Sequence, residues 1–147
     1  MFKRILIPTD GSALSKKAAR AGIAFAARQG ARVVGYYALM PAPAHLYGEG
    51  WVADRTVLQE LGKRNRETAR KYVAAIGREA QRAGVAFEAL IDEPRTPYEG
   101  IAAAARRRKC DLIFMASHGH RGLARLMLGS VADKVVQSSR VPVLVYR

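Results

Sequence analysis

The chain has 147 residues, of which 50% are hydrophobic, and this length and composition suit one compact domain and exclude an intrinsically disordered chain. Cys110 is the only cysteine, so an internal disulfide is excluded, and we expect a buried, unreactive thiol in a reducing compartment. Lysine and arginine outnumber the acidic residues by 25 to 12, and the net charge of +13 favours anions without choosing between nucleotides, nucleic acids and membrane surfaces.

The N-terminus carries no membrane signal. Only the apolar residues 5–7 stand between the basic pair at 3–4 and Pro8, which is too short for a signal-peptide core or a membrane span. No later stretch reaches spanning length without charges. We therefore expect a soluble, cytoplasmic protein that does not enter a membrane.

The first third of the chain predicts a strand, a helix and a second strand. Residues 3–8 begin a short strand, which the polar residues 9–12 interrupt. From residue 12 to 29 the apolar residues recur at helical spacing, and Gly30 is a typical helix stop. Residues 32–39 then predict a second, largely buried strand.

The middle of the chain predicts a loop, a long helix and an edge strand. Residues 40–52 hold prolines, glycines and the only tryptophan, as loops do. A helix is expected over 54–83, and the alternation in 85–91 indicates a strand at a sheet edge with one face nearer to water. The buried stripe expected on that helix is Leu58, Leu61, Ala69, Tyr72, Val73, Ile76 and Ala80.

The last third begins with a recognisable helix start. Thr96 is the expected N-cap, and Glu99 completes a capping box for a helix that reaches residue 109. Residues 111–116 are the most hydrophobic strand and are expected to be central. A helix over 130–138 and a strand over 141–146 follow, with Pro142 favouring an edge position for this last strand.

The alternation of strands and helices defines the expected fold class. It predicts an α/β open sandwich of the Rossmann-like kind, a parallel sheet with helices on both faces and right-handed crossovers. No repeat or linker divides the chain, so residues 1–147 are expected to form a single domain.

Two loops carry residues suited to a ligand. In open α/β sheets, ligands bind at the carboxyl ends of the strands, and residues 8–12 and 117–122 directly follow two predicted strands. The second loop leads to Gly129 and Ser130 at a helix start, where free backbone N–H groups favour phosphate. Ser130 could cap this helix or turn its hydroxyl to the ligand, while His120, Arg121 and Arg125 add positive charge. The alternative is a solvated loop before a well-capped helix.

These residues resemble a known family. The opening Pro8-Thr9-Asp10-Gly11-Ser12, the stretches 117–123 and 128–132, and the ending 141–145 are similar to the universal stress protein family over essentially the whole chain. The resemblance is weakest over 40–60 and 92–100. It implies five parallel strands in the order 3-2-1-4-5, and a homodimer through the terminal strand 141–146.

ATP-binding members of that family carry G-x2-G-x9-G-[ST] around the triphosphate. This pattern falls on Ala116, Gly119, Gly129 and Ser130, so three of its four positions agree and the first is alanine. The resemblance implies a regulatory stress-response protein that binds ATP, ADP or AMP, with Asp10 near the ribose or a phosphate-bound Mg²⁺. The nucleotide contacts that it implies are Pro8, Thr9, Asp10, Ala38, Ala116, His118, Gly119, Arg121, Gly129, Ser130 and Val131.

Other functions stay as alternatives. A slow ATPase or phosphotransferase is one, although no base for water attack stands out, and a dimeric scaffold without a nucleotide is another. Residues 118–120 suggest a metal pair that has no evident third ligand. The basic run 106–109 is most simply a solvated helix end; it lacks aromatic residues between its charges, so a nucleic-acid partner is not expected.

Overall fold

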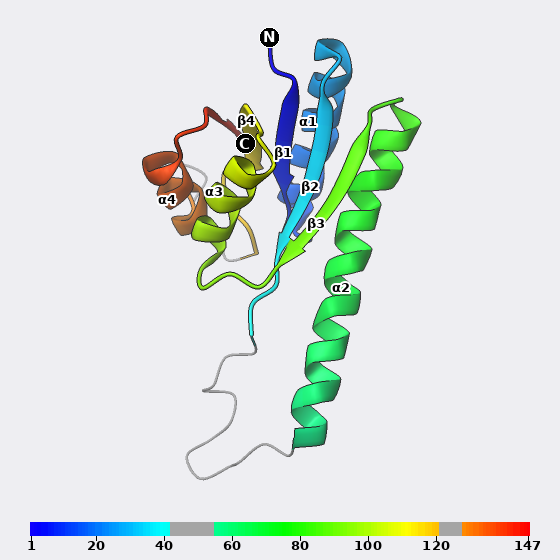
Figure 1. Ribbon diagram of the computed structural model, residues 1–147, viewed down its shortest axis with the longest axis vertical. Coiled ribbons are helices and arrows are strands. Elements are labelled where there is room, and N and C mark those ends of the chain that lie inside the picture. Colours follow the sequence, from blue (N-terminus) through cyan, green and yellow to red (C-terminus); the bar gives the residue numbers. More distant parts are fainter. Residues whose placement is uncertain (42–54, 121–127) are drawn as a thin grey trace.

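A computed structural model describes residues 1–41, 55–120 and 128–147, and Figure 1 shows strands and helices in alternation. The loop expected over 40–52 falls almost wholly outside the described residues. In chain order the elements are β1 (Arg4–Pro8), α1 (Ala13–Gln29), β2 (Arg32–Ala38), α2 (Arg55–Arg82), β3 (Phe87–Asp92), α3 (Pro97–Arg107), β4 (Leu112–Ala116), α4 (Ser130–Ser138) and β5 (Val143–Tyr146).

The strands form one parallel sheet in the order β3-β2-β1-β4-β5, which confirms the expected topology. Ile5 of β1 pairs with Val33 of β2 on one side and with Leu112 of β4 on the other. Residues 111–116 were expected to be central, and β4 is indeed an interior strand between β1 and β5, although the middle strand is β1. Every residue of β4 is nevertheless buried, since an interior strand is covered on both faces wherever it lies.

Helices cover both faces of the sheet. Helices α1 and α2 lie on one face, and α3 and α4 on the other (Figure 1). Successive side chains of a strand point to opposite faces, so Ile5 and Ile7 of β1 enter the core beneath α1 and α2, while Leu6 enters the core beneath α3 and α4. Full burial of such a side chain stabilises the fold by about 1.5–3 kcal/mol.

Local signals set the helix ends. The Ser12 hydroxyl accepts a hydrogen bond from the Ser15 N–H at 3.2 Å and caps α1, and Gly30 ends that helix with a left-handed φ of 64°. The Thr96 hydroxyl donates to the Glu99 carboxylate at 2.9 Å and accepts from the Glu99 N–H at 3.4 Å. The pairing of Thr96 with Glu99 at the start of α3 is thereby confirmed.

Helix α2 is buried along only part of the predicted stripe. Ala69, Val73, Ile76 and Ala80 are buried, whereas Leu58 is 45% exposed. The N-terminal half of this helix extends beyond the end of the sheet in Figure 1, so its apolar residues have no strand to cover. The stripe prediction is therefore right from Ala69 onward and wrong for Leu58.

Two further expectations concern β3 and Cys110. Strand β3 is an edge strand, as predicted, but both of its faces are used: Leu90 is buried in the core under α3, and Phe87 packs against the core under α2. Cys110 is buried, and burial raises the pKa of its thiol to about 11, as expected for an unreactive cysteine.

Within the described residues, no helix is long and apolar enough to cross a membrane.

Candidate functional site

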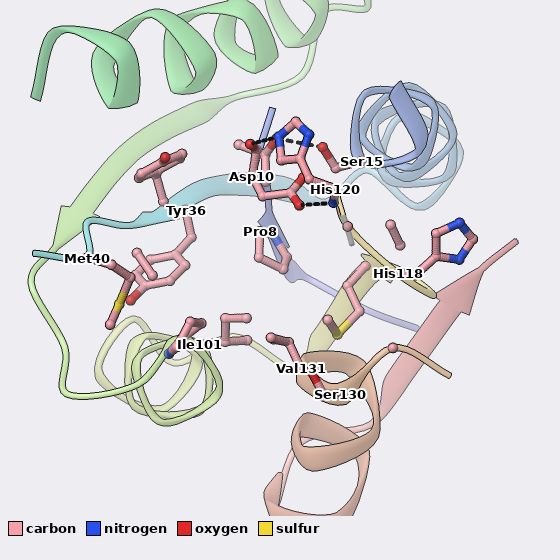
Figure 2. A pocket seen from close by; sticks show the side chains of 18 of the residues that line it. Pro8, Asp10, Ser15, Tyr36, Met40, Ile101, His118, His120, Ser130 and Val131 are labelled. Atoms are coloured by element: carbon pink, nitrogen blue, oxygen red, sulfur yellow. Dashed lines mark hydrogen bonds between the residues drawn. The ribbon is translucent and has the colours of Figure 1, made fainter. Parts of the chain in front are cut away.

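A cavity of about 760 Å³ opens at the carboxyl ends of β1, β2 and β4. Its remaining walls come from the starts of α3 and α4 (Figure 2). The sheet order changes direction at β1, because β2 lies on one side of it and β4 on the other. The cavity therefore lies at the topological switch point, where open α/β sheets bind their ligands.

The structure brings the predicted site residues together. Except for Arg121, the predicted site residues of the two loops and of the strand ends line this one cavity, although they come from distant parts of the sequence. Arg121 and Arg125 lie outside the described residues. The predicted residues that line the cavity are Pro8, Thr9, Asp10, Ala38, Ala116, His118, Gly119, Gly129, Ser130 and Val131.

The start of α4 differs from the starts of α1 and α3. Ser12 and Thr96 cap those two helices with side-chain hydrogen bonds, whereas the N-cap of α4 is Gly129, which makes none. Ser130 is the first residue inside the helix, which excludes it as the N-cap. Of the two roles expected for Ser130, only the contact with a ligand is left. Ser130 and Val131 line the cavity, and the first N–H groups of a helix have no partner within it. Uncapped donors and the helix dipole together make this corner of the cavity suited to an anion.

The glycines of the second loop permit close backbone approach. The Gly129 N–H donates to the Ser117 carbonyl oxygen at 2.7 Å. A Cβ on Gly129 would lie 3.0 Å from the His118 Cα, and a Cβ on Gly119 would lie 2.0 Å from Oδ2 of Asp10. A side chain at Gly119 is therefore incompatible with the observed position of the carboxylate.

Asp10 connects the two loops. Its Oδ1 accepts from the Ser12 N–H at 2.9 Å. Its Oδ2 accepts from the His120 N–H at 3.2 Å (Figure 2). Burial raises the pKa of the Asp10 carboxyl, but hydrogen bonds from Ser12 and Ser15 and the nearby His120 outweigh it, so the pKa is lowered overall. Asp10 thus carries a negative charge at neutral pH. Its carboxylate holds the backbone of its own loop at Ser12 and that of the second loop at His120.

The two histidines of the loop already have partners. The ring Nε2 of His120 lies 2.8 Å from the Asp10 carbonyl oxygen, and Nδ1 of His118 lies 3.0 Å from the Ser117 hydroxyl. A carbonyl oxygen only accepts, so Nε2 of His120 carries the proton in this contact. Among the residues that the structure describes, no group of three or more His, Cys, Asp or Glu side chains could hold a metal ion.

The opposite end of the cavity is apolar, and the sequence did not predict most of it. Tyr36, Met40, Pro97 and Ile101 line it beside Ala38. These residues follow from topology, because β2 ends and α3 begins at the same sheet edge as the two predicted loops. The Tyr36 hydroxyl is buried, and no hydrogen-bond partner for it is found among the described residues. An apolar slot of this kind suits a flat ring.

The basic run 106–109 is not part of the cavity. Arg107 forms an ion pair with Asp92, and Arg108 forms one with Glu88 at 3.0 Å. The Arg108 carbonyl oxygen also accepts from the Arg4 guanidinium at 2.7 Å. The run therefore joins the end of α3 to β3 and β1, which is more than the solvated helix end that the sequence predicted.

The sheet order and the position of the cavity define an α/β protein of the Rossmann-like class. The chain belongs to the universal stress protein family, whose model matches residues 1–147. It is 38% identical over 148 residues to "Universal stress protein in QAH/OAS sulfhydrylase 3'region" of Thermus aquaticus, and the match covers 100% of each chain. The solved structure of the protein MJ0577 of Methanocaldococcus jannaschii is 28% identical and superposes with a TM-score of 0.80, covering 99% of this chain and 95% of that one.

Two more distant solved structures share the fold. One is a universal stress protein in complex with cAMP, with 21% identity and a TM-score of 0.69, covering 99% of this chain and 97% of that one. The other is an Arabidopsis thaliana family protein with AMP bound, with 15% identity and a TM-score of 0.67, covering 97% and 90% of the two chains. At these identities the likeness concerns the fold.

Proposed function

We propose that this protein binds an adenine nucleotide, ATP in the first place, and acts as a regulatory protein of the stress response. The observation that carries this proposal is the uncapped N-terminus of α4, where Gly129 makes no side-chain hydrogen bond and Ser130 and Val131 face the cavity. An anion in this corner would supply the acceptors that Ser12 supplies to α1 and Thr96 supplies to α3.

The cavity offers a place for each part of the nucleotide. The adenine would lie in the apolar slot beside Pro8, Thr9 and Ala38, and the phosphates would meet the amides at Gly119 and at the start of α4. Asp10 would lie near the ribose or near a Mg²⁺ ion carried by the phosphates. Ala116 at the end of β4 takes the place of the first glycine in the family pattern. Solved proteins of this fold with cAMP and AMP support an adenine ligand.

A binding and regulatory role fits the described residues better than rapid turnover. Nε2 of His120 already donates its proton to a carbonyl oxygen, so this atom is not free to accept a proton from water. We therefore expect ATP hydrolysis to be slow. We also propose that the protein works in the cytoplasm, as a homodimer paired through 141–146.

A backbone substitution at residue 130 tests the phosphate site. Proline suits the first position of a helix, and Gly129 before it is already extended, so Ser130→Pro removes one N–H group and the hydroxyl while it keeps the helix. Ser130→Ala removes the hydroxyl alone and is the matched control. A hydrogen bond to a charged group contributes about 1.5–3 kcal/mol, so Ser130→Pro should bind Mg-ATP about tenfold more weakly than Ser130→Ala.

Isothermal titration calorimetry makes this comparison. We expect the difference between the two variants to be larger for ATP than for adenosine, because only the phosphates reach α4. Equal affinities of Ser130→Pro and Ser130→Ala would exclude the amide as a phosphate donor. An absence of binding heat with the folded wild-type protein at high micromolar concentration would refute the nucleotide-binding proposal itself.

A further inference from the structure

Tyr72 of α2 packs against the first loop of the site although it is not among the residues that line the cavity. A Cβ on Gly11 would lie 2.2 Å from ring atom Cζ and 2.3 Å from Cε2 of Tyr72. The hydroxyl end of this ring therefore lies directly on the Gly11 backbone. Gly11 has a φ of +79°, a conformation that glycine adopts readily and that no side chain of its own holds in place.

We propose that Tyr72 is a positioning residue for the site, which acts by holding the segment 9–12 in the shape that aims the Asp10 carboxylate. This inference rests on the proposed nucleotide-binding function. Tyr72 lies on a helix on one face of the sheet, and the loop that it supports lies at the carboxyl end of β1.

The second loop of the site also holds the segment. Oδ2 of Asp10 accepts from the His120 N–H at 3.2 Å, and the His120 ring contacts the Asp10 carbonyl oxygen at 2.8 Å. Within the segment, the Gly11 N–H donates to the Thr9 hydroxyl at 3.1 Å. The segment thus contacts both the Tyr72 ring and His120 of the second loop. Removing the ring leaves Gly11 without a packing partner on its α2 side.

Tyr72 is itself held firmly enough to do this. Its ring stacks on that of Tyr37, with centroids 6.1 Å apart and an interplanar angle of 30°, and Lys16 Nζ lies 5.8 Å from its centroid. Tyr37 lines the cavity at the end of β2. Tyr72 therefore contacts the loop that follows β1 through Gly11 and the cavity-lining end of β2 through Tyr37.

Amide hydrogen exchange in the nucleotide-free protein tests the contact directly. Gly11, Ser12 and His120 donate the N–H groups that shape this segment, to Thr9 and Asp10. In Tyr72→Leu we expect these amides to exchange about tenfold faster, because local opening costs less without the ring. Tyr72→Phe keeps the ring and should retain the wild-type rates. Tyr72→Met is the second variant if Tyr72→Leu proves unstable.

A control of the same chemistry is available on α3. Tyr98 has Lys134 Nζ at 5.4 Å from its ring, as Tyr72 has Lys16, but it packs in the other core. Tyr98→Leu should leave the three exchange rates unchanged. Affinity for Mg-ATP should fall about tenfold in Tyr72→Leu, since small displacements of positioning groups are costly, and stay within about twofold in Tyr72→Phe and Tyr98→Leu.

The outcomes separate this inference from the proposed function. Unchanged exchange at the three amides in Tyr72→Leu and Tyr72→Met would overturn the positioning role, as would an equal loss of affinity in Tyr98→Leu. If the wild-type protein bound no nucleotide, the proposed function would fail, and the exchange rates would still decide whether Tyr72 holds the segment.

Discussion

At the scale of single residues, the surroundings of Asp10 determine its charge. Its carboxylate is partly buried, yet hydrogen bonds from Ser12 and Ser15 and the nearby His120 keep its pKa below the ordinary value of 3.8. A carboxyl whose pKa is lowered by folding stabilises the folded protein when it is charged. This contribution to stability is complete at pH values above the pKa that Asp10 has in the unfolded chain. It is lost as the pH falls through the pKa that Asp10 has in the folded protein.

Asp10→Asn isolates this contribution. The variant cannot titrate at residue 10, so we expect the wild-type protein to lose its stability advantage over Asp10→Asn as the pH falls below 3.8. Urea unfolding of both proteins over a series of pH values measures the difference, and the other carboxylates cancel in it. A stability difference that stays constant down to the acid limit of folding would show that Asp10 is not stabilised in its charged form.

The sequence predicted which residues of the two loops line the cavity, but not most residues of its apolar end. Asp10, Gly119 and Ser130 stand in two polar segments after strands, so the general rule for α/β sheets was enough to bring them together. The same rule does not identify Tyr36 or Tyr72 as residues of the site. Both look like core tyrosines in the sequence, and their contacts with Gly100 and Gly11 depend on how α3 and α2 settle on the sheet.

At the scale of elements, α3 shows how far a local signal reaches. Thr96 and Glu99 predicted where this helix begins, because a capping interaction involves only neighbours in sequence. Its end was predicted at residue 109 and lies at Arg107. The basic residues there would continue a helix by propensity, but Lys109 has a left-handed φ of 51°, which a continuing helix does not allow.

The cap of α3 makes a stability prediction. Replacing an N-cap threonine with alanine costs about 1 kcal/mol, so Thr96→Ala should lower the free energy of unfolding by about that amount. Thr96→Ser keeps the hydroxyl and is the matched control, with stability close to wild type. Urea denaturation measures both. Equal stability of Thr96→Ala and wild type would mean that water replaces the Thr96 hydroxyl at no cost.

Helix α2 shows where a local signal fails. Its apolar residues recur at helical spacing from Leu58 to Ala80, and this periodicity predicted one continuous buried stripe. Burial also depends on the length of the sheet beneath, and the strands span only 4–7 residues each. A helix of 28 residues cannot cover such strands along its whole length.

At the scale of the whole molecule, β5 offers an outer edge. Carbonyl oxygens of Pro142 and Tyr146 accept hydrogen bonds from β4, so the alternate residues Val143 and Val145 direct their backbone groups away from the sheet. All residues of β5 are partly exposed in the single chain. An exposed apolar edge is a template for pairing with another strand, which supports the proposed dimer.

Val145→Pro tests that dimer. Proline at residue 145 removes an N–H group that points away from the sheet, so every hydrogen bond between β4 and β5 is kept. Edge strands tolerate proline at such positions. We expect the light-scattering mass to fall from that of two chains toward that of one, while the near-ultraviolet circular dichroism stays unchanged. Val145→Ile is the control and should remain dimeric. A monomeric wild-type protein at micromolar concentration would overturn the proposal.

The uncapped start of α4 also bears on the far end of that helix. Because α4 leads within a few residues into β5, a ligand that completes its first turn would steady the same segment that is proposed to join two subunits. Nucleotide binding at the start of α4 and subunit pairing through β5 would then be coupled. Each would change the free energy of the other by the same amount, as for any two coupled equilibria. If the protein binds a nucleotide at α4 and pairs through 141–146, a bound nucleotide would then change the affinity of the two subunits for each other.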